Sequence, residues 1–159
     1  MGTRKVKLEI DGPVPSELVG DNSPSVWPGD NPALYGSVTL TPVTPVEARS
    51  FQTFKIVYTV GKLGIDDTGG IQIAFRRIGD MGRPQTSQPT AANYTTATSN
   101  GEGRIDLEVS FTGMRPWNLL VTAHQSGGYL KEGEENEIIL GDNRKGSPGI
   151  PMPPFVESG

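Results

Sequence analysis

The sequence contains no cysteine and a single histidine, His124. Without cysteine the chain has no disulfide framework and no thiolate chemistry, which fits a reducing compartment. A lone histidine does not make the usual zinc site, and no nucleophile motif accompanies it to suggest a serine-type triad. We therefore expect no catalytic residue, metal site or cofactor in this chain, and we interpret His124 as a polar residue at the end of a strand.

Long apolar runs and an excess of positive charge are also missing. No segment is apolar and long enough to cross a membrane, and the basic start, residues 1–7, lacks the apolar run of a signal peptide. The 14 basic and 18 acidic residues give a net charge of −4 and are mixed along the chain, so there is no electrostatic footprint for nucleic acid. If the chain is complete, we expect a cytoplasmic protein that binds neither nucleic acid nor membrane.

Glycine and proline, by contrast, are abundant, with 21 and 14 among the 159 residues. The length fits a single domain, residues 1–159, and the composition predicts many turns and loops. Prolines recur in an arm, residues 11–35, where the missing backbone donors exclude sheet interior, and in a tail, residues 141–159. Within the tail we expect residues 150–155 to lack regular structure and to pack along a surface of this chain or of a neighbour.

Apolar and polar residues alternate with a period of two through most of the remaining chain. Residues 51–60, rich in β-branched and aromatic side chains, form the best predicted strand, and no window has a convincing helical period. The pattern predicts an all-β fold, an antiparallel β-sandwich of immunoglobulin-like or jelly-roll-like type with long Pro/Gly-rich loops and extended termini. The other predicted strands are residues 5–10, 37–40, 70–77, 94–97, 105–111, 117–123 and 137–140.

The first part of the tail is the strongest candidate for a binding loop. Residues 141–149 follow a predicted strand directly and combine Asp142, Arg144 and Lys145 with three glycines. A constrained turn explains this composition, but binding residues concentrate on loops held by rigid scaffolds, so a loop that contacts a partner or ligand is the functional alternative. Trp27 in the arm and Phe155 in the tail are the other predicted contacts, because both stand in apolar, proline-rich segments.

Two further patterns each have a structural and a functional interpretation. Asp66 and Asp67 lie in a glycine-containing turn whose oxygens suit Ca²⁺, but the EF-hand spacing is absent and turns favour aspartate for its own hydrogen bonds. Aromatic side chains are able to line a sugar-binding face, although most aromatics at strand positions belong to the core. The aromatics in question are Trp27, Tyr58, Tyr94, Trp117 and Tyr129.

Three spaced segments carry a resemblance to a known family. They are residues 51–71, residues 88–94, and the stretch from Leu130 to Gly149 that ends in LGDNRKGSPG. These segments are similar to the N-terminal β-rich region of a bacterial domain-of-unknown-function family. The C-terminal part of that family resembles a metallohydrolase of the polymerase-and-histidinol-phosphatase type. The resemblance implies that the metal ligands belong to the C-terminal domain, whose motifs are absent here, so no catalytic residue carries over.

These observations together favour an accessory function, in which the chain acts as part of a larger protein or complex. The expected function is that of a noncatalytic small subunit or accessory domain of a larger metal-dependent hydrolase or lyase, in a hetero-oligomer. The arm and the tail would dock it, its loops would complete the partner's substrate pocket, and any divalent metal would sit in the partner. The alternative is a stand-alone carbohydrate- or ligand-binding β-sandwich module, and a third hypothesis is a small enzyme centred on His124.

Overall fold

The computed structural model describes residues 32–76, 82–111 and 117–154. The chain divides into two compact units, Met1–Asp30 and Asn31–Gly159, and the described residues all belong to the second. The predicted strand at residues 5–10 and the predicted contacts Trp27 and Phe155 lie outside the described residues.

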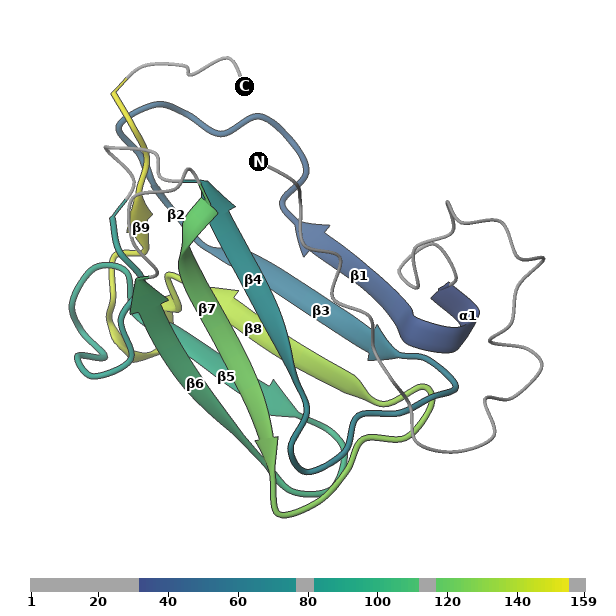
Figure 1. Cartoon of the computed structure of the whole chain (residues 1–159). Helices are drawn as coiled ribbons and strands as arrows, with labels where there is room; N and C mark the ends of the chain where they lie inside the picture. Colours follow the sequence, from purple (N-terminus) through teal and green to yellow (C-terminus); the bar gives the residue numbers. More distant parts are fainter. Residues whose placement is uncertain (1–31, 77–81, 112–116, 155–159) are drawn as a thin grey trace, which may run out of the picture. The chain divides into compact units, whose positions relative to one another are not determined.

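The described part of the chain is nearly all β, as the alternating sequence pattern predicts (Figure 1). Each strand predicted within it is present, with bounds shifted by a few residues. Two short helical turns accompany the strands, α1 (Pro32–Tyr35) and η2 (Asn143–Lys145). The strands are β1 (Gly36–Thr41), β2 (Phe51–Gln52), β3 (Phe54–Val60), β4 (Gly70–Arg76), β5 (Thr95–Ser99), β6 (Arg104–Phe111), β7 (Trp117–Ser126), β8 (Glu135–Leu140) and β9 (Ile150–Pro151).

The strands form two main sheets and one short strand pair. One sheet has the order β1-β3-β8-β5 and the other the order β4-β7-β6, while β2 pairs with β9. All neighbouring strands are antiparallel. The prediction of an all-β antiparallel sandwich is therefore confirmed.

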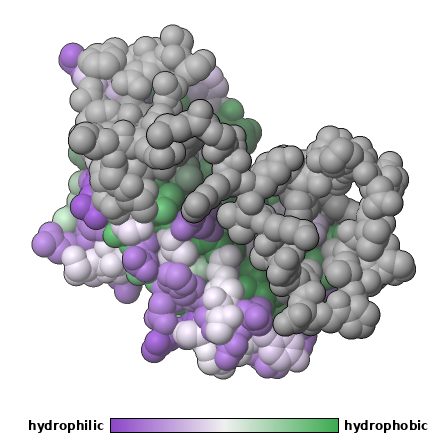
Figure 2. Space-filling model, viewed as in Figure 1, coloured by the Kyte–Doolittle hydropathy of each residue, from purple (hydrophilic) through white to green (hydrophobic). Residues whose placement is uncertain are grey.

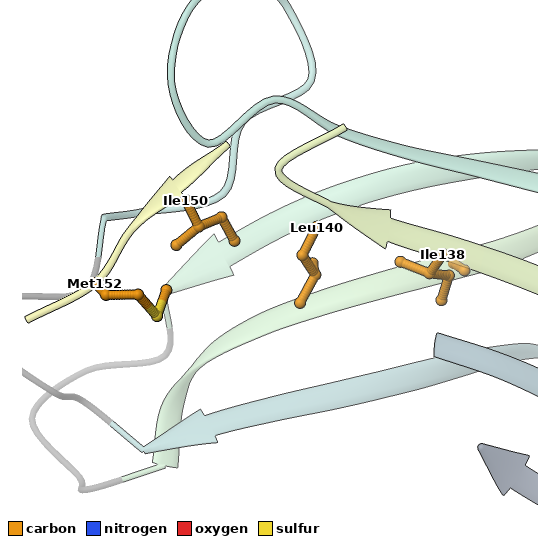
Figure 3. Close-up of a cluster of buried hydrophobic side chains, with 5 residues drawn as sticks. Ile138, Leu140, Ile150 and Met152 are labelled. Atoms are coloured by element: carbon orange, nitrogen blue, oxygen red, sulfur yellow. The ribbon is translucent and has the colours of Figure 1, made fainter. Parts of the chain in front are cut away.

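The hydrophobic core lies between the two main sheets. Ile138 and Leu140 come from β8, Ala123 comes from β7, and Ile150 and Met152 come from the tail. Figure 3 shows that the labelled side chains of β8 and of the tail project into the same space. Because successive strand residues point to opposite faces, each contributing strand sends every second residue inward. The partly buried residues packed against the cluster are Val46, Phe54, Ile56, Ile73, Ala97, Ile105 and Leu107.

The structure corrects the expectation that residues 150–155 lack regular structure. Ile150–Pro151 forms β9 and pairs with Phe51–Gln52, and the backbone amide of Met152 donates to the carbonyl of Ser50 at 2.8 Å. Proline lacks a backbone donor, but a two-residue strand tolerates it because the neighbouring residues supply the hydrogen bonds. The first half of the tail's apolar end thus packs on the chain's own core.

Two smaller differences concern the predicted strand at residues 51–60 and the predicted absence of helix. The strand is interrupted at Thr53, whose hydroxyl donates to the carbonyl of Gly141 at 2.8 Å. On one side of the interruption β2 pairs with β9 of the tail, and on the other side β3 pairs with β8.

The helical turn Pro32–Tyr35 begins with a proline, which is favoured at a first helical position because its missing amide hydrogen is not needed there.

Candidate functional site

The predicted binding loop, residues 141–149, folds as a short capped turn between β8 and β9. Asp142 is the N-cap of η2, and its carboxylate accepts the backbone amide of Arg144 at 3.0 Å. Gly146 ends the turn in the left-handed region, with φ of 96°. Aspartate before the first turn and glycine after the last are the residues such a turn favours, so local physics accounts for the fold of this segment.

Asp142 is buried, only 2% exposed, and its carboxylate is fully engaged. It accepts the Arg144 guanidinium through Nε at 2.9 Å and Nη2 at 2.7 Å, and the Thr96 hydroxyl at 2.6 Å. The hydrogen bonds from Arg144 hold the pKa of Asp142 far below its usual range, and the same contacts raise the pKa of Arg144. A buried charge is tolerated when it is paired and hydrogen-bonded in this way.

The loop presents two positive charges at the surface. The side chain of Arg144 is 55% exposed although its Nε and Nη2 atoms are held by Asp142, and Lys145 beside it is exposed. We call the segment 141–149 the basic loop. The structure therefore brings the predicted contacts Asp142, Arg144 and Lys145 together, with Asp142 as the inner support and the two basic residues outside.

A second polar cluster, which the sequence analysis did not single out, lies on the outer face of the sheet β4-β7-β6. Arg104 donates to Asp106 through Nε at 3.1 Å and Nη2 at 2.9 Å, and the hydroxyl of Ser126 donates to the same carboxylate at 3.0 Å. These hydrogen bonds, those of Arg104 first, lower the pKa of Asp106. Arg104 and Asp106 occupy alternate positions of one strand, a pattern typical of any solvent-exposed strand face. Ser126 lies on the neighbouring strand, so the sequence around each residue does not indicate that the three side chains meet.

His124 belongs to the same face and lies within β7, two residues before its end. Its Nε2 atom lies 3.4 Å from a carboxylate oxygen of Glu108, and its partner position across the ladder is Asp106. Ser126 is two positions along the same strand, about 7 Å away at the usual rise per residue. Its hydroxyl bonds to Asp106 and to the carbonyl of Arg104. The hydrogen bond between nucleophile and base that a serine triad needs is therefore not formed in this arrangement.

A shallow depression of about 390 Å³ adjoins this cluster where β6 begins and β7 ends. It is lined by Gly103, Arg104, Ser126 and Gly127. Tyr129, 51% exposed, follows Gly127 by two residues, and the ammonium group of Lys131 lies 5.1 Å from the centre of its ring. Polar side chains predominate over the lower part of the face in Figure 2. The depression thus has one charged and one hydroxyl side chain, Arg104 and Ser126, in its lining.

Two further sequence candidates, Tyr94 and Asp66, have structural roles. Tyr94 is buried rather than part of an exposed aromatic row, and the side chain of Trp117 lies outside the described residues. In the turn after β3, Asp66 accepts the backbone amide of Thr68 at 3.0 Å and its hydroxyl at 2.9 Å, and these bonds lower the pKa of Asp66. Within the described ranges no group of three His, Asp or Glu side chains is placed to hold a metal ion.

No helix among the described residues is long and apolar enough to cross a membrane. Comparisons of the chain with protein-family models, with curated proteins and with solved structures found no match in any of the three.

Proposed function

We propose that this chain is a noncatalytic accessory subunit or domain of a larger metal-dependent hydrolase or lyase, and that it docks to its partner through the basic loop. One observation carries the docking part of the proposal. The buried carboxylate of Asp142 holds the guanidinium of Arg144 at the surface, beside the exposed Lys145. The choice of partner class follows from the family resemblance of residues 51–71, 88–94 and 130–149, and any divalent metal belongs to that partner.

The geometry of Arg144 suits it to bind a carboxylate on another protein. A guanidinium has five donor hydrogens, and Asp142 and Thr96 use those of Nε and Nη2. The Nη1 group has no hydrogen-bond partner among the described residues, so two donors remain. Because the side chain is already fixed, docking costs little further conformational entropy. Arg144 and Lys145 are adjacent in the chain and both exposed, so they offer an acidic partner surface two neighbouring basic groups.

The test is capture of the untagged chain from its own host, followed by binding measurements with the purified partner. We expect native mass spectrometry to reveal a complex with a heavier, metal-containing chain. Isothermal titration should then show that Arg144→Ala/Lys145→Ala binds at least tenfold more weakly, about 1.4 kcal/mol. Arg104→Ala is the matched control, because Arg104 is also paired with an aspartate but lies on the other sheet. The proposal would be contradicted if native mass spectrometry showed the chain alone, or if the two variants lost the same amount of binding affinity.

The depression beside Tyr129 favours a second candidate function, binding of a carbohydrate or another small polar ligand. The exposed ring of Tyr129 offers a stacking surface, and Arg104 and Ser126 place polar side chains in the depression. We expect a glycan screen to give a ligand whose binding is lost in Tyr129→Ala and kept in Leu63→Ala, which removes an exposed apolar side chain elsewhere. If no glycan in the screen binds, carbohydrate binding is excluded as a function.

A further inference from the structure

Among the described residues, strand β1 is an edge strand whose inward side is covered by no strand of the opposing sheet. It pairs with β3 along one edge, and along the other edge no strand pairs with it among the described residues. Leu40 lies opposite Ile56 in the ladder and therefore shares its face, and Ile56 packs against the core. Yet Leu40 is 45% exposed and Val38 61% exposed. In the described part of the chain the opposing sheet has three strands against four, and the exposed Val38 and Leu40 lie on the strand that it does not cover.

The same strand lacks the features that keep sheet edges from pairing. Protective edges carry charges, prolines or bulges, because a bare edge offers unpaired backbone donors and acceptors to another chain. β1 reads GSVTLT, with neither a charge nor a proline. By contrast β6, an edge of the other sheet, carries Arg104, Asp106 and Glu108. Within residues 32–76, 82–111 and 117–154, the β1 edge is therefore open to pairing with a further strand.

The sequence of β1 is complementary to itself when two copies run antiparallel. With the two-fold axis at Thr39, Val38 lies opposite Leu40 of the second copy, and Ser37 lies opposite Thr41. Apolar residues then meet apolar residues on one face and hydroxyls meet hydroxyls on the other, and no like charges oppose each other. A two-fold interface requires this kind of self-complementarity, because one surface has to fit itself.

From this complementarity we infer that β1 is a homodimer interface. Two copies pair edge to edge through β1, centred on Thr39, and their four-stranded sheets join into one of eight strands. Val38 and Leu40 of both copies then form one continuous apolar surface. The inference goes beyond the proposed function, since it uses neither the basic loop nor a larger partner. One six-residue strand pair is a small interface, so we expect a dissociation constant on the order of micromolar.

The first test measures the oligomeric state of the full chain across the micromolar concentration range by sedimentation equilibrium. We expect a reversible monomer–dimer equilibrium, with slow hydrogen exchange of the β1 amides in the dimer. The variant Val38→Lys/Leu40→Lys places like charges opposite each other and should weaken dimerisation at least tenfold. Both side chains are exposed, so thermal melting should show an intact fold. A chain that stays monomeric, or a dimer that is unaffected by the two lysines, would overturn the inference.

A second test determines the register of the two β1 strands in the dimer. Because the sequence contains no cysteine, an introduced thiol is the only one available for cross-linking. Thr39→Cys places two thiols opposite each other across the two-fold axis, where Cβ atoms of facing residues are about 5 Å apart. A short thiol cross-linker should therefore join this variant efficiently. Ser37→Cys, on the same side of the same strand, is the matched control, since each of its thiols would face Thr41 of the second copy. Cross-linking of Ser37→Cys as fast as Thr39→Cys would rule out the proposed register.

Discussion

At the scale of single residues, the basic loop depends on the buried carboxylate of Asp142. Removing a carboxylate from water costs several kcal/mol unless hydrogen bonds replace its hydration. Here they come from the backbone and guanidinium of Arg144 and from the hydroxyl of Thr96, which lies 46 residues earlier in the chain. Asp142 thus fastens the loop to β5 as well as orienting Arg144.

We expect Asp142→Asn to lower the free energy of unfolding by about 2 kcal/mol at neutral pH, because it removes charge-assisted hydrogen bonds in a buried place. Asp66→Asn, at an exposed turn with comparable bonds to Thr68, is the matched control and should cost less. The folded-state pKa of Asp142 lies below the unfolded value of about 3.9. Its stabilisation is therefore complete above that pH and is lost as the pH falls towards the folded pKa.

Urea denaturation at several pH values checks both parts of this prediction. The gap in stability between the native chain and Asp142→Asn should be constant from neutral pH down to about pH 5 and should then narrow as acid protonates the native carboxylate. A gap that widens in acid would contradict the assigned direction of the pKa shift.

At the scale of elements, the tail acts as a structural strand. Gly149 makes the turn into β9 with φ of 111°, and a Cβ atom there would lie 2.7 Å from the carbonyl oxygen of Gln52. The absence of a side chain lets the tail approach β2 closely enough to pair. The result places Ile150 and Met152 in the core, next to β8.

Ile150→Ala should therefore destabilise the domain by about 3 kcal/mol, the usual cost of emptying a fully buried aliphatic site. Val43→Ala, at an exposed loop position, removes an apolar side chain without creating a cavity and should change the stability little. Thermal or chemical unfolding followed by circular dichroism measures the difference. Equal, small effects of the two substitutions would show that the tail is not an integral part of the core.

At the scale of the whole molecule, the features that the sequence predicted are the local ones. Alternation along each strand depends on neighbouring residues, and it was sufficient to predict the sandwich and the strands of its two main sheets, although not β9. The pairing of β2 with β9 joins residues about 100 positions apart, and nothing local in either segment indicates it. The exposure of Val38 and Leu40 also has no local signal, because alternation shows which side of a strand is apolar but not how far the opposing sheet extends.

In the candidate sites too, the sequence predicted the features that depend on neighbouring residues and missed those that depend on distant ones. Capping chemistry is local, so aspartate and glycine in residues 141–149 predicted a constrained turn, and the basic residues beside them predicted a binding loop. The burial of Asp142 depends on Thr96, a distant residue, and a carboxylate in a glycine-rich loop would ordinarily be expected in solvent. The cluster of Arg104, Asp106 and Ser126 needs two strands in register before it exists.

The position of Ile150 and Met152 in the core has a consequence for synthesis on the ribosome. A nascent chain that has emerged through β8 carries both main sheets but still lacks two members of the core. Its strands then enclose an incompletely filled interior, and the open end beside β2 stays in contact with water and with other nascent chains. Emergence of the last dozen or so described residues from the ribosome is thus the step that completes the core. Any delay before that step prolongs the interval in which apolar surface is exposed.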